Sequence, residues 1–94
     1  MEPAIDLGIV LAILSGFRNT VLDSALVAFG EVGLSGEIRA VPMIKERVQE
    51  AARLGFSSAI LPKSALRADL GARGMRLIGA VDLGEAIRAV AKEQ

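Results

Sequence analysis

The sequence predicts a single α/β domain over residues 1–94, and three observations lead to that class. A chain of 94 residues suits one small domain. Apolar residues recur at helical spacing near both ends and in the middle of the chain. Between these helical segments lie short apolar or alternating runs bounded by glycine and proline, which are typical of strands. The expected order of elements is therefore α-β-β-α-β-β-α.

The first helix is expected to begin at Glu2-Pro3, because proline is tolerated in the first turn, and to end near Gly16. Apolar side chains follow at positions 5, 9, 10, 13, 14 and 17. They leave little polar surface, so the helix should be covered on most sides. The uncharged run Leu7–Phe17 is far shorter than the ~20 residues of a membrane-spanning helix. No positively charged region precedes it, so it does not read as a signal peptide.

A β-hairpin is expected next. Ser24–Phe29 is apolar and suits a strand, and Glu37–Val41 alternates polar and apolar residues. Gly30–Gly36 supplies the turn, with Leu34-Ser35-Gly36 at the tip. The three glycines at 30, 33 and 36 also raise the possibility of a phosphate-binding loop. No Gly-Lys-Ser/Thr follows them, and a strand rather than a helix comes next, so the hairpin is favoured.

The second helix is expected over Pro42–Leu54 and should end at Gly55. Its buried stripe consists of Ile44, Val48, Ala51 and Ala52. A short buried strand, Ala59–Leu61, should stop at Pro62. Residues 63–74 then form a loop with one helical turn.

The last two elements are a strand over Met75–Ala80 and a C-terminal helix. Asp82 and Glu85 have the spacing of a capping box, with the acid at the N-cap and the glutamate three residues on. The buried face of the helix consists of Leu83, Ala86, Ile87, Val90 and Ala91.

Composition excludes several kinds of chemistry. The chain has no cysteine and no histidine. Disulfides, zinc sites built from these residues and a histidine general base are therefore absent. Apolar residues make up 52 % of the chain, and the mean hydropathy is +0.48. These values are high for so small a domain, so some apolar surface is expected to meet another protein or another part of the same one.

Charge is distributed unevenly, although the net charge is zero. Residues 1–37 carry one arginine and five acids, whereas residues 38–81 carry eight lysines and arginines and three acids. A basic face in the middle of the chain would suit phosphate contacts, although a solvated surface is the plainer interpretation. Three phenylalanines with no tyrosine or tryptophan argue against base stacking. The candidate DNA contacts are Arg39, Lys45, Arg47 and Arg53, followed by Arg67 and Arg73.

Lys45 and Asp6 are the two further candidates. Lys45 lies in the first turn of a predicted helix, where a positive charge is mildly unfavourable. It is either a solvated lysine or one that serves an anion, a partner or a reaction. Asp6 in the first turn of the first helix would stabilise the helix dipole, or would lie at a subunit contact.

Three stretches carry a resemblance to a known family: EPAIDLGIVLAILSGFRN, LVAFGEVGLSGEIRAVPMIKERVQEAARLGFSSAILPK and LIGAVDLGEAI. Together they resemble the C-terminal domain of the bacterial RadA (Sms) DNA repair proteins, which is similar to the proteolytic domain of Lon protease. The resemblance covers the whole chain in order. It implies the Lon C-terminal type of fold, a ribosomal-protein-like α/β sandwich, here without the first strands of the family domain.

The resemblance also bears on catalysis. Lon-type proteases use a serine and a lysine, and Lys45 lies at the lysine position. Asp6 lies at the serine position, and a carboxylate cannot replace the hydroxyl nucleophile. The dyad is therefore expected to be inactive, and this chain is not expected to be an enzyme. A Ser-Lys peptidase or an inactive relic of one is kept as an alternative.

For function, the resemblance implies a non-catalytic scaffold and DNA-binding module of a RadA-like, ATP-dependent recombination and repair protein in the bacterial cytoplasm. Its partners would be DNA and further copies of itself, a hexamer in the family, with no membrane. The chain itself should need no cofactor, because ATP, Mg²⁺ and Zn²⁺ would belong to other parts of the longer protein. A pure oligomerisation domain is the remaining alternative.

Overall fold

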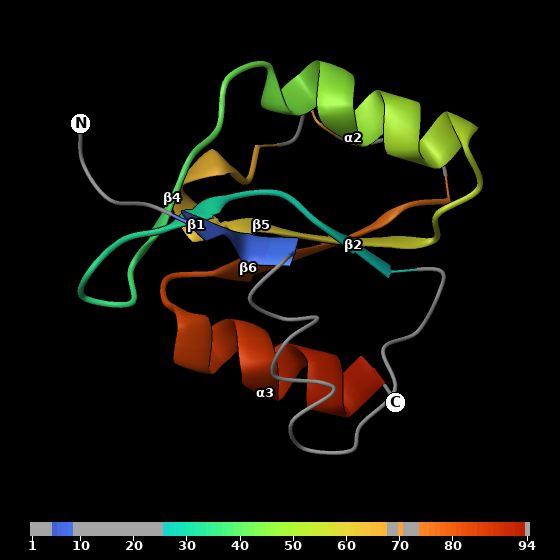
Figure 1. Cartoon of the computed structure of the whole chain (residues 1–94). Coiled ribbons are helices and arrows are strands. Elements are labelled where there is room, and N and C mark those ends of the chain that lie inside the picture. Colours follow the sequence, from blue (N-terminus) through green and yellow to red (C-terminus); the bar gives the residue numbers. More distant parts are fainter. Residues whose placement is uncertain (1–4, 9–25, 68–69, 71–73, 94) are drawn as a thin grey trace.

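The computed structural model describes residues 5–8, 26–67, 70 and 74–93, and Figure 1 shows their arrangement. Two helices lie on opposite faces of a central sheet: α2 (Ile44–Arg53) on one face and α3 (Leu83–Glu93) on the other. The result is an α/β domain with three layers.

The central sheet is parallel, with strand order β2-β5-β6. Its strands are β2 (Leu26–Ala28), β5 (Ser58–Pro62) and β6 (Arg76–Ala80). Five residue pairs join β5 to β6, from Ser58 opposite Arg76 to Pro62 opposite Ala80. Helix α2 lies in the connection from β2 to β5, as parallel pairing requires a crossover.

A second, antiparallel sheet has the order β1-β3-β4. Strands β3 (Glu31–Val32) and β4 (Ile38–Arg39) form a hairpin, and β1 (Ile5–Asp6) pairs with the outer side of β3. The Leu7 N–H donates a hydrogen bond of 2.9 Å to the Gly30 carbonyl, between β2 and the hairpin.

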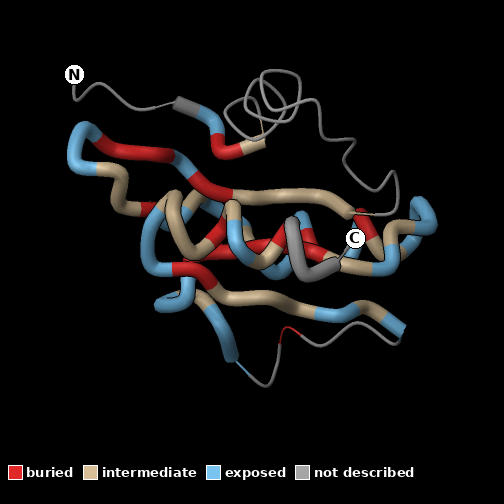
Figure 2. Tube along the Cα trace, turned by 90° about the horizontal axis from the view of Figure 1, so that it is seen from below, coloured by how far each residue is buried: buried red, intermediate tan, exposed pale blue. Residues whose placement is uncertain are grey.

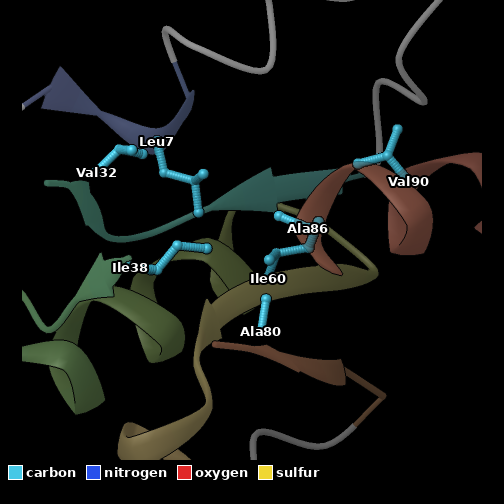
Figure 3. Packing of buried hydrophobic residues seen from close by; sticks show 7 residues of the cluster. All are labelled: Leu7, Val32, Ile38, Ile60, Ala80, Ala86 and Val90. Carbon is cyan, nitrogen blue, oxygen red and sulfur yellow. The ribbon is translucent and has the colours of Figure 1, made fainter. Parts of the chain in front are cut away.

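Alternation along the parallel strands divides the core between the two faces of the sheet. On the α3 face, Ile60 packs with Ala80, Ala86 and Val90 (Figure 3). On the α2 face the buried cluster is Val48, Ala59, Leu61 and Leu70. Figure 2 shows the buried residues in the interior of the molecule and exposed ones in the connecting turns, and further exposed residues lie on α2. Complete burial of one such aliphatic side chain stabilises the fold by roughly 1.5–3 kcal/mol.

Helix α2 has an unusual beginning and a regular end. Met43 precedes it in the left-handed conformation, with φ 58° and ψ 43°, and makes no side-chain capping bond. At the other end, the Gly55 N–H donates to the Ala52 carbonyl and the Phe56 N–H donates to the Ala51 carbonyl. This is a Schellman motif, and Gly55 adopts the positive φ of 99° that the motif requires.

Helix α3 begins with the predicted cap. The Glu85 N–H donates to Asp82 Oδ1 at 2.9 Å. Glu85 Oε1 accepts a 2.7 Å bond from the Val81 N–H, one residue before the position that a capping box would use.

The expected element order is wrong at the N-terminal end. Asp6 lies in strand β1, not in the first turn of a helix, because it pairs opposite Glu31. The next two residues, Leu7 and Gly8, are helical as predicted, whereas residues 2–4 and 9–16 of the predicted first helix lie outside the described residues.

The first strand of the hairpin is also corrected. Within Ser24–Phe29, the described residues Leu26–Ala28 form a strand that joins the parallel sheet instead of the hairpin. Its consecutive apolar residues contribute to both core clusters, which is typical of a strand covered on both faces. The hairpin partner of β4 is the short strand Glu31–Val32 beside the turn.

The other elements agree with the sequence. The second helix, the hairpin tip, the strands near 59–61 and 75–80 and the last helix all lie where they were expected. Pro62 is the last residue of β5 and is fully buried, rather than standing outside the strand. One turn of 3-10 helix, η1 (Lys63–Ala65), supplies the helical turn expected in the following loop.

Candidate functional site

The β3–β4 hairpin is a compact turn held by its own backbone. The Gly36 N–H donates to the Gly33 carbonyl at 3.0 Å, and the Gly33 N–H donates to the Glu37 carbonyl at 2.9 Å. Gly36 has a φ of 82°, which a side chain would disfavour. A strand follows this turn, so the three glycines form a hairpin and not a phosphate-binding loop before a helix.

One candidate DNA contact, Arg39, is engaged within the hairpin. Its Nη2 and Nε donate to Glu37 Oε2 at 2.8 and 3.2 Å. Glu37 Oε1 accepts a 3.1 Å bond from the Ser35 N–H. The hydrogen bond from Arg39 is the main cause that lowers the pKa of the Glu37 carboxyl below its ordinary value. Arg39 therefore orders the hairpin turn as well as adding charge.

Three further candidates lie on α2 and are exposed. Arg53 forms an ion pair with Glu50 one turn earlier, which lowers the pKa of Glu50 and raises that of Arg53. Arg47 Nε donates to the Pro42 carbonyl at 2.8 Å. Lys45 is exposed in the first turn. Of the remaining candidates, Arg67 is exposed after η1, and Arg73 lies outside the described residues.

The two positions of the Lon-type dyad lie on different elements. Asp6 is in β1 of the antiparallel sheet, and Lys45 is at the beginning of α2; both are exposed.

A groove of about 420 Å³ lies between α2 and the edge strand β2. Its apolar lining comes from Val27, Phe29, Met43, Ala51, Leu54 and Phe56. Met43 and Leu54 are 67 % and 64 % exposed, which is high for large apolar side chains. Sequence reasoning placed excess apolar surface somewhere on the chain but did not locate this groove. The available signal was Met43 and Leu54, two large apolar residues near the ends of the predicted helix that are not part of its predicted buried stripe.

The described part of the chain shows neither a cluster of metal ligands nor a membrane-spanning helix. There, no group of three or more acidic side chains is arranged to hold a metal ion. Over the same residues, no helix has the length and apolar character needed to cross a bilayer.

The fold and these surfaces are those of a small α/β domain. Comparison with known protein families identifies the family of this domain. A family model described as subunit ChlI of Mg-chelatase matches residues 2–65, more than half of the chain. The chain therefore belongs to this family, whose Lon-like character agrees with the resemblance seen in the sequence.

Within that class, the chain is homologous to a segment of DNA repair protein RadA. It is 47 % identical to RadA of Bacillus subtilis over 87 residues, which are 93 % of this chain and 19 % of the relative. It is 39 % identical to RadA of Synechocystis over 90 residues, or 96 % of this chain and 17 % of the relative. RadA of Haemophilus influenzae is 56 % identical over 61 residues, or 65 % and 13 %. The chain thus spans about a fifth, or less, of the length of these relatives.

Proposed function

We propose that the chain is a non-catalytic scaffold and DNA-binding module of a RadA-like, ATP-dependent recombination and repair protein. The match to DNA repair protein RadA over nearly the whole chain carries this proposal. The longer protein would supply the ATPase activity and the Mg²⁺ and Zn²⁺ sites, and would act in the cytoplasm. The module would contact DNA and further copies of itself.

Exposed basic side chains support the DNA-binding part of the proposal. Lys45, Arg47 and Arg53 project from one ten-residue helix, and Arg67 is exposed after η1. Such side chains bind the phosphate backbone regardless of base sequence, and the affinity falls as salt rises because counterions are released. Arg53 is the weakest contact of the three on α2, because Glu50 already neutralises it.

Asp6 supports the non-catalytic part. A carboxylate at the position of the nucleophilic serine leaves Lys45 with no hydroxyl there to activate. Incubation with an unfolded protein substrate tests this part. The unmodified chain should not cleave the substrate, and cleavage by the unmodified chain would contradict the proposal.

Fluorescence anisotropy with labelled single-stranded and duplex DNA tests the proposal, using Lys45→Glu, Arg47→Glu and Arg39→Gln. We expect each phosphate contact that is lost to weaken binding to all sequences and to lower the salt slope by about one unit. Arg88→Glu is the matched control, because Arg88 is exposed on α3, on the other face of the sheet.

Unchanged affinity in the α2 variants would remove these residues from the DNA interface. DNA affinity that is absent at low salt, with assembly intact, would favour the pure oligomerisation domain instead. The groove beside α2 is the observation that keeps this second function open.

A further inference from the structure

Methionine is the side chain of this protein that peroxides oxidise most readily. The other oxidisable groups of proteins are the thiol and the imidazole, indole and phenol rings, and the chain has no cysteine, histidine, tryptophan or tyrosine. Of the three methionines in the sequence, Met43 and Met75 lie among the described residues. A thioether reacts as a neutral group, so its rate of oxidation depends on how freely the oxidant reaches the sulfur.

These two methionines differ in their access to solvent. Met43 is 67 % exposed, in the turn that precedes α2. Met75 is half-buried just before β6, where it packs against the buried cluster on the α2 face of the sheet. A small oxidant therefore reaches Met43 in the native fold, whereas full access to Met75 requires the core beside it to open.

The backbone holds Met43 at this exposed position. In the part of the chain that the structure describes, Met43 is the one residue other than glycine with a positive φ. Its carbonyl accepts a 3.0 Å hydrogen bond from the Arg47 N–H, which closes the first turn of α2. Its side chain makes no capping hydrogen bond. An oxygen added to the sulfur therefore breaks no capping contact at the start of the helix.

Oxidation at this position changes the groove beside α2. Met43 lines the groove together with the apolar side chains of Phe29, Leu54 and Phe56. Conversion of the thioether to the sulfoxide replaces a flexible apolar group by a polar one whose oxygen accepts hydrogen bonds. A polar oxygen that an apolar partner covers without a hydrogen bond is costly, so the oxidised groove is a poorer apolar surface.

We propose that Met43 is a reversible oxidation site, at which hydrogen peroxide forms methionine sulfoxide while the fold stays intact. The sulfur lone pair attacks one peroxide oxygen, the S–O bond forms, the O–O bond breaks, and water leaves. The sulfur loses two electrons and the peroxide gains them. Methionine sulfoxide reductases reverse the step with a dithiol, which becomes a disulfide as water is released. This inference goes beyond the proposed function and depends on neither DNA binding nor assembly.

Timed exposure to hydrogen peroxide, stopped with catalase and followed by peptide mapping in a mass spectrometer, tests the selectivity. In the folded chain, Met43 should gain oxygen about fivefold faster than Met75, or more, because its side chain is the more accessible. In a denaturing concentration of urea, the two rates should agree to within about twofold, since unfolding removes the difference in access. Equal rates in the folded chain, or a preference for Met43 that persists after unfolding, would overturn the proposal.

The same samples test reversal and the intact fold. Met43→Leu is the matched control, because it keeps an apolar side chain of similar size and the peptide that carries residue 43 should then gain no oxygen. Incubation of the oxidised, folded chain with methionine sulfoxide reductases for both sulfoxide epimers and dithiothreitol should restore the thioether at position 43. Circular dichroism should be the same before and after oxidation. A sulfoxide that is reduced only after unfolding, or a loss of helical signal on oxidation of Met43, overturns the reversible site.

Discussion

Glu37 connects the charge and the geometry of the hairpin. Its two carboxylate oxygens accept hydrogen bonds from the Arg39 side chain and from the Ser35 N–H. One acidic side chain thus ties a strand residue to the turn. Arg39, a candidate DNA contact, is for this reason also a residue that orders the turn.

Acid should weaken the hairpin through this carboxylate. The folded pKa of Glu37 lies below its ordinary value of 4.5, so its contribution to stability is complete above that value. The contribution is lost as the pH falls through the lowered pKa of the folded state. Chemical denaturation between pH 2 and pH 7 should therefore show a smaller acid loss of stability in Glu37→Gln than in the unmodified chain.

Glu50→Gln is the comparison for that experiment, since the pKa of Glu50 is lowered by Arg53 in the same direction. Its effect should add to that of Glu37→Gln, because the two pairs lie on separate elements. A pH profile that Glu37→Gln leaves unaltered would contradict the role assigned to the Glu37–Arg39 pair.

At the scale of elements, the sequence predicted the helices and turns whose ends are determined by capping and turn residues close by in the chain. Gly55 ends α2, Asp82 caps α3, and the turn at Leu34-Ser35-Gly36 lies where it was expected. Strand pairing was harder, because Leu26–Ala28 is equally suited to a hairpin and to a parallel sheet. Contacts with β5, distant in sequence, decide between them. Asp6 was placed in a helix for the same reason, since pairing with Glu31 is a tertiary effect.

The C-terminal end of α2 gives the prediction at this scale. Gly55→Ala forces a side chain into a backbone with φ 99°, although nothing lies within 4 Å of the added carbon. The cost is therefore conformational, and we expect about 1 kcal/mol. For a domain of this size, that lowers the melting temperature by roughly 4–8 °C. Gln49→Ala, in the exposed interior of the same helix, should leave the melting temperature the same or slightly higher.

Candidate sites were predictable from sequence only as residue types. The exposed cations of α2 were found by their charge, and the helix carries them to the surface. The groove was not found, because Phe29 and Phe56 border it only after β2 and α2 have packed. The residues around Phe29 and Phe56 in the sequence do not distinguish these two side chains from phenylalanines of an ordinary core.

For the whole molecule, stability depends on a central sheet covered on both faces. Ile60 is fully buried in the middle strand β5 and packs in the cluster on the α3 face. Ile60→Ala should cost about 2–5 kcal/mol and Ile60→Val about 0.5–1.5 kcal/mol. Urea denaturation measures both, and the two midpoints should fall in that order. Equal and small effects would mean that the sheet is not the common core of the domain.

The hairpin is joined to the last helix by its backbone. The Leu83 N–H in the first turn of α3 donates to the Gly36 carbonyl at 2.8 Å, and the Ile38 N–H donates to the Val81 carbonyl at 3.0 Å. A partner that binds the turn is therefore expected to affect the first turn of α3 through these hydrogen bonds, although α3 begins some 45 residues further along the chain. Hydrogen exchange at the amides of Leu83 and Ile38 should therefore report on the turn. We expect the exchange to slow when a partner covers the turn and to quicken when the turn separates from α3.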